Sequence, residues 1–441
     1  MKIILVFFLV IYHAALFYSL SNQPVLLRDS EEYIHSAISF ETNGNFYAGP
    51  QTEEKDYRLY TKRTPLYPLV LYTFRALNLH WNYIYILQVF LGLFNIYLAF
   101  LLLKPLIKKT FIPYMFLAIL ILFTPSQFIY SQFIMADLWL QTFIMICVLT
   151  FALFMKTRNS IWLIGLVIFL TLAALAKPVF LFASFAVAIM CLYFFLFQKK
   201  QRAWAVIAVL PFLSWFALSS QNEKLTNVFH YSSIGNINLL HYNTQLYLNK
   251  AIGKAETEKL LEPLMIVPRT KVEFKENYDK VNSICKGALL SRFAGYLIYH
   301  CKGMVYFFLD PGRFDLYNFF RIEEGNSKGF LHKGADANRL RTMYNNHPNI
   351  AIGLGLIFLV KIIKTIGFIG FVWIQRKNPI VLAGATIVFY MAFLTGPLGA
   401  SRFALPVELI IMCFASVFYG SLYLKHFQNL KLRKNKSLPT S

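Results

Sequence analysis

The chain has 441 residues, of which 57% are hydrophobic and 17% aromatic, and its formal net charge at pH 7 is +22. Its mean hydropathy of +0.51 excludes an ordinary soluble domain, because a core of this length cannot hide so much apolar surface. The charge alone would suit nucleic acid, but the basic residues fall in short loops between apolar runs, so we expect an integral membrane protein and no nucleic-acid partner.

The apolar runs predict about ten transmembrane helices, since most approach the roughly 20 residues that cross a bilayer. In chain order they cover residues 3–20, 83–103, 111–124, 138–155, 160–176, 179–197, 203–219, 350–373, 379–396 and 403–424. Residues 292–309 are also apolar, but His300 and Lys302 interrupt them, so an interfacial or re-entrant segment is expected there. The predicted fold class is an all-α polytopic membrane protein.

The first run follows Lys2, as in a secretory signal peptide. Tyr12 and His13 lie within its core, and no small-x-small cleavage site follows it. These features favour a retained first helix over a cleaved signal peptide.

Charge patterning predicts the orientation. Basic residues occupy alternate short loops and the tail, at Lys104, Lys108, Lys109, Lys156, Arg158, Lys199, Lys200, Arg202, Arg376, Lys377 and residues 425–436. The positive-inside rule assigns these loops and both termini to the cytoplasm. Acidic residues gather instead in residues 29–56 and 223–336, which are expected on the outer face.

The chain therefore divides into four predicted parts. They are an N-terminal transmembrane module (1–219) with an external loop (21–81), an external domain of helical or mixed structure (220–349), C-terminal transmembrane helices (350–424) and a basic cytoplasmic tail (425–441). Residues 254–264 and 271–290 of the external domain have helical patterns. Cys285 and Cys301 lie in that domain, where a disulfide and two free thiols are both compatible with the sequence, and no cysteine has zinc or haem spacing.

In the first external loop, residues 29–40 predict a short amphipathic surface helix that Asn43-Gly44 ends. Asp29 at its start is a candidate general base, although with Glu32 it also has the spacing of a helix cap. Arg63, in the segment Lys62-Arg63-Thr64-Pro65-Leu66-Tyr67-Pro68, offers a guanidinium for a phosphate or an interfacial anchor.

Three further charged residues are expected at the outer face. Asp137 opens an apolar run, either as a site residue or as a carboxylate that stabilises a helix N-terminus. Lys177 and Arg402 break the positive-inside trend, which favours a phosphate partner. Arg402 could instead pair with Glu408, which is deeper in the same run. A solvated turn is expected for a last group, His300, Lys302, Asp310, Arg313, Asp315 and Arg321.

The order of these motifs resembles the GT-C superfamily of membrane glycosyltransferases, in particular bacterial relatives of dolichyl-phosphate-mannose protein mannosyltransferases and lipid A aminoarabinose transferases. The matching motifs are Asp-x-x-x-Tyr from Asp29 to Tyr33, Arg-Thr-Pro-Leu-Tyr-Pro at 63–68, the acidic Asp137, Ala-Lys-Pro at 176–178 and Arg-Phe-x-Leu-Pro at 402–406.

The resemblance implies a GT-C-like bundle that moves a sugar, with inversion, from a polyprenyl-phosphate donor to an acceptor hydroxyl at the outer face. It implies Asp29 as the base, and Asp137 is expected as a second catalytic carboxylate. The expected substrate-binding residues are Glu32, Tyr33, Arg63, Tyr67, Lys177 and Arg402. The implied location is a bacterial inner membrane, with membrane lipids as further partners and the site on the periplasmic or extracellular side.

One departure concerns the acceptor. Protein mannosyltransferases of this superfamily carry Asp-Glu where this chain has Asp29-Ser30, which argues against a protein acceptor and leaves a glycan or lipid acceptor equally open. No metal-ligand spacing is evident, and Mg²⁺ or Mn²⁺ on loop acids is left open. The alternatives are a Wzy-like glycan polymerase or ligase and a lipid-linked sugar transporter or flippase. A transporter is expected to have ionisable residues near the membrane midplane and two halves of related sequence. In this chain the candidate site residues are expected at the outer interface instead.

Overall fold

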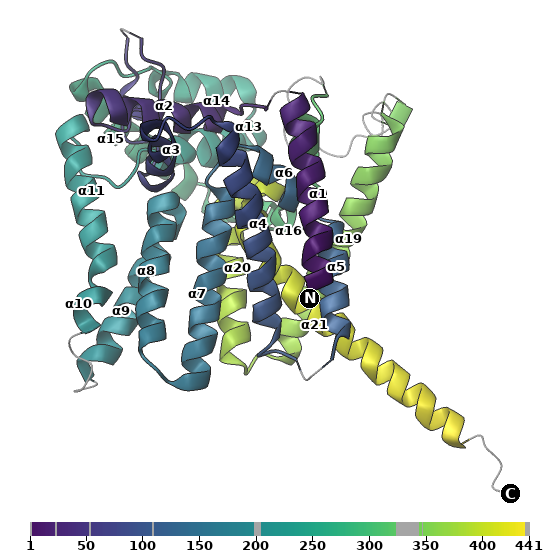
Figure 1. The fold of residues 1–441 in the computed structure, drawn as a ribbon. Helices are drawn as coiled ribbons and strands as arrows, with labels where there is room; N and C mark the ends of the chain where they lie inside the picture. Colours follow the sequence, from purple (N-terminus) through teal and green to yellow (C-terminus); the bar gives the residue numbers. More distant parts are fainter. Residues whose placement is uncertain are drawn as a thin grey trace, which may run out of the picture.

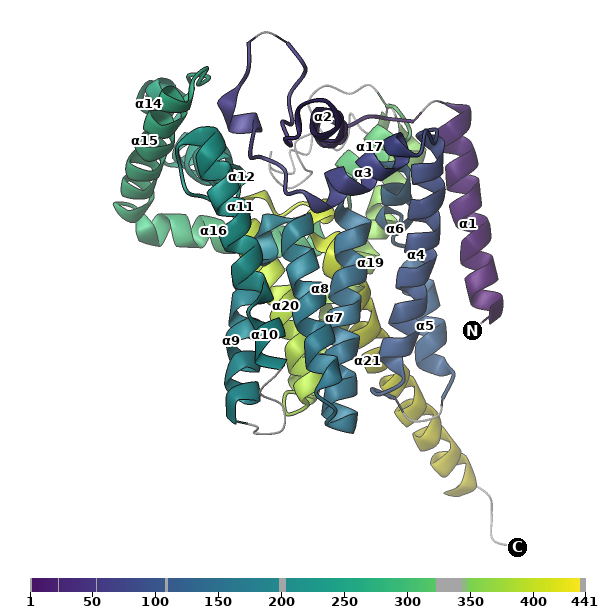
Figure 2. The same ribbon diagram turned by 60° about the vertical axis from the view of Figure 1, so that its left-hand side comes forward.

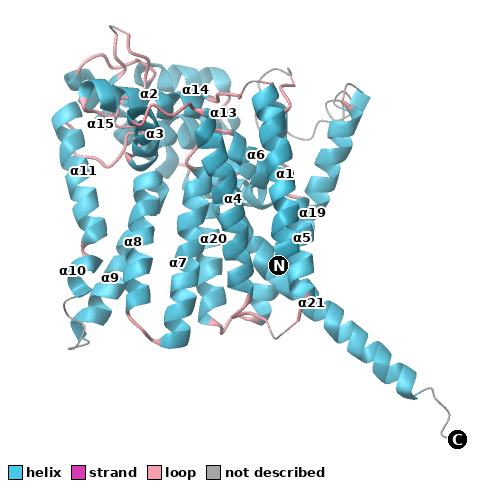
Figure 3. Ribbon diagram, viewed as in Figure 1, coloured by secondary structure: helices cyan, strands magenta, loops and turns pink. Residues whose placement is uncertain are grey.

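The structure is a computed structural model that describes residues 2–22, 24–52, 54–107, 110–197, 204–322, 344–345 and 347–436. All regular elements in these ranges are helical (Figure 3), which confirms the all-α prediction. Each predicted apolar run forms a helix or a pair of helices. These are α1 (Lys2–Ser21), α4 (Asn82–Leu103), α5 (Ile112–Leu122) with α6 (Ser126–Ile129), α7 (Asp137–Thr157), α8 (Ile161–Ala176), α9 (Leu181–Phe197), α10 (Ala205–Ala208) with α11 (Leu210–Thr226), α19 (Pro348–Ile374), α20 (Pro379–Thr395) and α21 (Ser401–Lys436).

Within the described residues, seven helices are long and apolar enough to cross a membrane, or eight if one pair bent by 70° counts as a span. The sequence predicted about ten. Two of the predicted runs fall short: α8 has only 16 residues, and the run at 203–219 is divided between α10 and α11. Pro211 in the first turn of α11 explains the division, because proline is compatible with a helix start but not with a continuous helix interior.

The long helices run side by side between two ends of the molecule (Figure 1). The loops that join α4 to α5, α7 to α8 and α19 to α20 lie at the end from which the second half of α21 projects, and we call this the basic end. The opposite end, which carries the segments 24–81 and 227–320, is called the site end. This separation agrees with the charge pattern, although Lys108, Lys109, Lys199, Lys200 and Arg202 lie outside the described residues.

Short helices cover the site end (Figures 1 and 2). The predicted surface helix is α2, Arg28–Asn43, and it ends at Gly44, whose positive φ of 65° suits glycine. The remaining helices are α3 (Leu66–Ala76), α12 (Ile234–Asn238), α13 (Leu246–Ala251), α14 (Lys254–Leu261), α15 (Lys271–Leu290), α16 (Phe293–Leu309) and α17 (Arg313–Phe319). Figure 2 shows α16 lying across the ends of the long helices rather than alongside them.

The core centres on α7 and α21, which both begin at the site end. In α21, 83% of the most apolar stretch is buried, and in α7 61% is. Asp137 is the first residue of α7 and Arg402 the second residue of α21. The two best-buried helices therefore carry their charged first turns to the layer that holds α2.

Candidate active site

Asp29 lies in the first turn of α2, but it does not cap the helix. The N-cap residue is Leu27, whose N–H donates to Ser30 Oγ at 3.3 Å. The predicted capping role of Asp29 is therefore wrong, because the helix begins one residue earlier than the pattern suggested. Its carboxylate is free to face the helix bundle.

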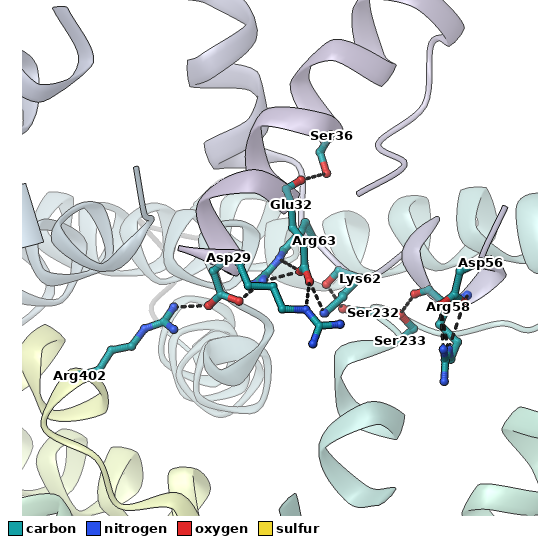
Figure 4. Close-up of polar contacts among 11 residues, drawn as sticks. Asp29, Glu32, Ser36, Asp56, Arg58, Lys62, Arg63, Ser232, Ser233 and Arg402 are labelled. Atoms are coloured by element: carbon teal, nitrogen blue, oxygen red, sulfur yellow. Dashed lines mark hydrogen bonds and ion pairs between the residues drawn. The ribbon is translucent and has the colours of Figure 1, made fainter. Parts of the chain in front are cut away.

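Two arginines hold the Asp29 carboxylate (Figure 4). Arg63 Nη2 lies 2.5 Å from Asp29 Oδ1, and Arg402 Nη2 lies 2.5 Å from Oδ2. Burial by itself would raise the pKa of Asp29, but Arg402 and Arg63 outweigh burial and hold this pKa well below its usual value. Asp29 is thus ionised at every physiological pH.

Arg63 is fixed by a second carboxylate. Glu32, one turn after Asp29 on α2, accepts hydrogen bonds from Arg63 Nε at 2.9 Å and Nη2 at 2.6 Å. Its other oxygen accepts from Lys62 Nζ at 2.6 Å. Glu32 is only 7% exposed, so both cations depend on it for charge compensation.

The 230–233 segment also fixes the position of Lys62 and Arg63. Ser232 Oγ donates to the Lys62 carbonyl at 2.9 Å, and Ser233 N–H donates to the Thr61 carbonyl at 3.1 Å. Figure 4 shows Ser232 and Ser233 beside this stretch of chain. The loop that carries Arg63 is therefore held between α2 and the 230–233 segment.

Tyr33 and Tyr67 support Arg63 from beneath. The Arg63 guanidinium lies 4.6 Å from the Tyr33 ring centroid, and the edge of the Tyr67 ring packs on Tyr33 at 4.9 Å. Tyr67 O–H donates to Gln88 Oε1 at 2.9 Å. Burial raises the pKa of Tyr33 to about 12. Both rings are buried, so their observed contacts are with the protein and the predicted direct contact with substrate stays a prediction.

Asp137 and Lys177 form the inner pair of the site. Lys177 Nζ lies 2.6 Å from Asp137 Oδ1, and the Asp137 side chain is 1% exposed. Lys177 follows the last residue of α8 in an extended conformation, as expected before Pro178. Burial lowers the pKa of Lys177, and the attraction of Asp137 offsets this only in part.

Arg402 joins this pair to Asp29. Its Nη2 lies 3.6 Å from Asp137 Oδ2, besides its contact with Asp29. Within the described residues, Asp137 Oδ2 and Arg402 Nε are buried atoms without a hydrogen-bond partner. The Arg402 Nε–H, a hydrogen-bond donor, and Asp137 Oδ2, a hydrogen-bond acceptor, are thus available to a ligand.

The described residues that interact in this way form one continuous series of charges, which we call the charge row. In spatial order it consists of Lys62, Glu32, Arg63, Asp29, Arg402, Asp137 and Lys177. Arg28 also lies 3.6 Å from Glu32, but its side chain is 87% exposed, so we leave it out of the row. The remaining four cations face three carboxylates, so the formal charge of the row is 4 − 3 = +1. The sequence predicted every member except Lys62, which it noted only as part of the Arg63 motif.

Glu408 does not pair with Arg402, so that predicted alternative is wrong. Its carboxylate accepts from Lys361 Nζ at 3.1 Å and from Lys364 Nζ, and Lys364 also donates to Thr124 Oγ1 at 2.9 Å. All three charged side chains are at most 4% exposed. Charges inside the apolar run 350–373 were the signal for this cluster, and the expectation that charge lies at the outer interface overlooked them.

The predicted solvated turn at 310–315 is also wrong. Asp310, Arg313 and Asp315 are 2% to 4% exposed, and both carboxylates accept hydrogen bonds from Ser401 at the start of α21. Cys285 is buried and Cys301 exposed, and both are free thiols. Among the described residues, no group of three or more His, Cys, Asp or Glu side chains is arranged to hold a metal ion.

No protein-family model and no curated protein matches the chain. Among solved structures, the chain is similar to the crystal structure of ArnT from Cupriavidus metallidurans bound to undecaprenyl phosphate. The match has 12% sequence identity and a TM-score of 0.40, and it covers 94% of this chain and 76% of that chain.

Proposed function

We propose that the protein is an inverting glycosyltransferase that moves a sugar from a polyprenyl-phosphate donor to an acceptor hydroxyl at the outer face of a bacterial inner membrane. The supporting observation is the pair of contacts on Asp29, whose two carboxylate oxygens each lie 2.5 Å from an arginine. A base and the cations that a phosphate needs are thereby in contact, although they come from distant parts of the chain.

In the proposed reaction, the acceptor oxygen attacks the anomeric carbon of the donor sugar while Asp29 takes the hydroxyl proton. The bond between that carbon and the phosphate oxygen breaks, and its electron pair leaves with the polyprenyl phosphate. Attack from the face opposite the phosphate inverts the anomeric centre. No covalent intermediate on the protein is needed.

The charge row suits this reaction because the total charge of the site does not change. Before transfer, its +1 is balanced by the single negative charge of a phosphodiester donor. After transfer, protonated Asp29 leaves the row at +2, and the released phosphate monoester carries two negative charges. A poorly hydrated site favours such a step, since no net charge has to be created in it.

Arg402 and Lys177 are the proposed phosphate ligands. In the part of the chain that the structure describes, the buried Arg402 Nε has no hydrogen-bond partner, and Lys177 adjoins Arg402 across Asp137. Guanidinium groups bind phosphate oxygens through two parallel hydrogen bonds. Asp137 then acts by holding both cations rather than by accepting a proton.

A second candidate, a lipid-linked sugar transporter, is favoured by one observation. Lys361, Lys364 and Glu408 are buried charges within membrane-spanning helices, where ionisable residues often line transport paths. Glu408 pairs with both lysines and compensates one of their two charges, and such a buried ion pair also fits a purely structural role.

The experiment is mass spectrometry of lipid-linked sugars in a strain that lacks the gene, with their sidedness determined in spheroplasts. A transferase predicts that a polyprenyl-phosphate sugar accumulates on the outer leaflet and that its acceptor lacks the sugar. Accumulation on the cytoplasmic leaflet would identify a transporter instead. Unchanged lipid-linked sugars and glycans would contradict both candidates.

A further inference from the structure

Ser401, the residue before Arg402, is held by two buried carboxylates that the proposed mechanism does not use. Its N–H donates to Asp310 Oδ2 at 2.7 Å, and its hydroxyl donates to Asp315 Oδ2 at 2.8 Å. The three side chains are 2% to 4% exposed. The start of α21 is therefore fixed by hydrogen bonds to charged groups, which are stronger than bonds between neutral ones.

The carboxylate of Asp315 is itself tied to a third part of the chain. Tyr130 O–H donates to Asp315 Oδ1 at 2.6 Å. Tyr130 lies in the short helical segment that precedes α7, so Asp315 connects this segment to α21. The helix that carries Arg402 therefore begins next to this carboxylate, and the segment that leads into α7 is hydrogen-bonded to it.

Gly312 makes the arrangement possible. Its φ is +79°, and a Cβ atom at this position would lie 3.0 Å from Asp315 Oδ2 and 3.2 Å from Ser401 Oγ. Only glycine provides both this backbone conformation and the space for the hydrogen bond.

We propose that Asp315, acting through Ser401, is a positioning residue that sets the Arg402 guanidinium between Asp29 and Asp137 and so determines how tightly a polyprenyl phosphate is held. Arg402 follows Ser401 directly, so the orientation of its backbone depends on the Ser401 hydrogen bonds. This inference rests on the proposed function, because it concerns the same phosphate.

The proposal implies a dependence on pH. Burial raises the pKa of Asp315 to about 6, against the hydrogen bonds from Tyr130 and Ser401 and the charge of Arg402. Asp310 faces the same group, and burial raises its pKa too, while Lys361 across the adjoining cavity offsets part of that rise. A protonated Asp315 offers a donor in place of one acceptor, so it cannot accept from both hydroxyls in the same geometry. Asp315 therefore accepts both hydrogen bonds, from Tyr130 and from Ser401, above about pH 6, and this pair of bonds is lost as the pH falls below that value.

The test measures binding of undecaprenyl phosphate to the full chain in nanodiscs by native mass spectrometry. For the wild type, affinity should fall between about pH 7.5 and about pH 5.5, as Asp315 gains a proton. Asp315→Asn should weaken binding at the higher pH by about threefold to tenfold and remove this part of the pH dependence. Asp279→Asn, which changes an exposed aspartate of α15, is the matched control and should bind like the wild type.

A double-mutant cycle separates positioning from a general loss of structure. In an Arg402→Ala background, Asp315→Asn should add little or no further weakening, because its effect passes through Arg402. A full additional loss in that background would overturn the inference. Ser401→Ala keeps the backbone hydrogen bond to Asp310 and should reproduce part of the effect of Asp315→Asn on binding. It serves as the test variant if Asp315→Asn does not yield a monodisperse protein.

The outcomes also distinguish this inference from the proposed function. If Arg402→Ala and Lys177→Ala both leave the affinity for undecaprenyl phosphate unchanged, the phosphate assignment itself fails. If they weaken binding while Asp315→Asn and Ser401→Ala do not, only the role of Asp315 is overturned.

Discussion

Arg402 Nη2 lies 2.5 Å from Asp29 Oδ2, although Arg402 lies in the first turn of α21 and Asp29 in the first turn of α2. A carboxylate held in this way is a weak base, since nearby cations stabilise its ionised form. A donor phosphate that draws Arg402 toward itself would raise the basicity of Asp29. We therefore expect the acceptor to be activated only after the donor has bound.

Asp29→Asn removes the proposed base and keeps the size of the side chain. Transfer should fall by about 10² to 10⁴, the usual contribution of a general base. The measurement is sugar transfer in nanodiscs, with the donor identified in the deletion strain. Glu31→Gln changes an exposed carboxylate of the same helix and should have near-normal activity. Near-normal turnover in Asp29→Asn would remove Asp29 as the base.

Lys177→Ala and Arg402→Ala each remove a proposed phosphate ligand. The KM for the lipid donor should rise by roughly tenfold or more, the usual effect of losing a hydrogen bond to a charged group. Steady-state kinetics at varied donor concentration provide the test. Lys156→Ala, at an exposed position of the basic end, is the control. Unchanged donor kinetics in both site variants would assign these cations to structure.

The pH profile should have an alkaline limb set by Lys177. Its pKa lies below the usual value, so it loses its charge, and with it phosphate affinity, at a lower pH than an exposed lysine does. Lys177→Arg should move this limb to higher pH, because arginine stays protonated. On the acid side, Asp29 of the free protein stays ionised because Arg402 and Arg63 hold its pKa well below the usual value, so a fall of kcat/KM toward about pH 5.5 is expected to report Asp315 rather than Asp29. A profile of kcat and KM against pH for both proteins checks each limb.

Glu408→Gln should destabilise the protein by roughly 3 to 5 kcal/mol, since it leaves Lys361 and Lys364 without their counter-charge. The readout is thermal unfolding in detergent. Replacing all three residues together, by Lys361→Met, Lys364→Met and Glu408→Leu, should restore much of the stability and retain transfer. A stable triple variant that cannot process the lipid-linked sugar would give the cluster a functional role.

Cys301 offers a test of orientation in the native chain. It is the exposed member of the five free cysteines, and the other four are buried. If the site end faces the periplasm, a membrane-impermeant maleimide should label intact spheroplasts, and Cys301→Ser should abolish the signal. In that background, Glu31→Cys should label from outside and Lys156→Cys only after lysis. The reverse pattern would invert the predicted topology.

The sequence predicted much of the fold because local patterns determine it. Hydrophobic runs locate the long helices, and the apolar spacing together with Gly44 gives α2 to within one residue at its start. The charge pattern also brought Asp29, Asp137, Lys177 and Arg402 to one end of the molecule. Each of them lies at a helix terminus, where alternating loops fix the side of the membrane.

The ion-pair and hydrogen-bond partners of the charged residues were harder to predict, because they depend on how distant helices pack. Arg402 and Glu408 share one helix and suggested a pair, yet packing of α19 gives Glu408 two lysines and leaves Arg402 for Asp29. The Asp310-Pro311-Gly312 segment has the composition of an exposed turn. Its burial follows from the position of Ser401, which no local pattern near residue 310 could reveal.

The charge row is built from two pieces of protein. Lys62, Glu32, Arg63 and Asp29 all belong to the covering layer, whereas Arg402, Asp137 and Lys177 belong to the helix bundle. The ion pair between Asp29 and Arg402 connects the part of the row in the covering helices and loops with the part in the helix bundle. If the helices that cover the site end moved away from the bundle, Asp29 would separate from Arg402 while Arg63 moved with it, so lipid access to the charge row and release of the carboxylate from Arg402 would be one movement.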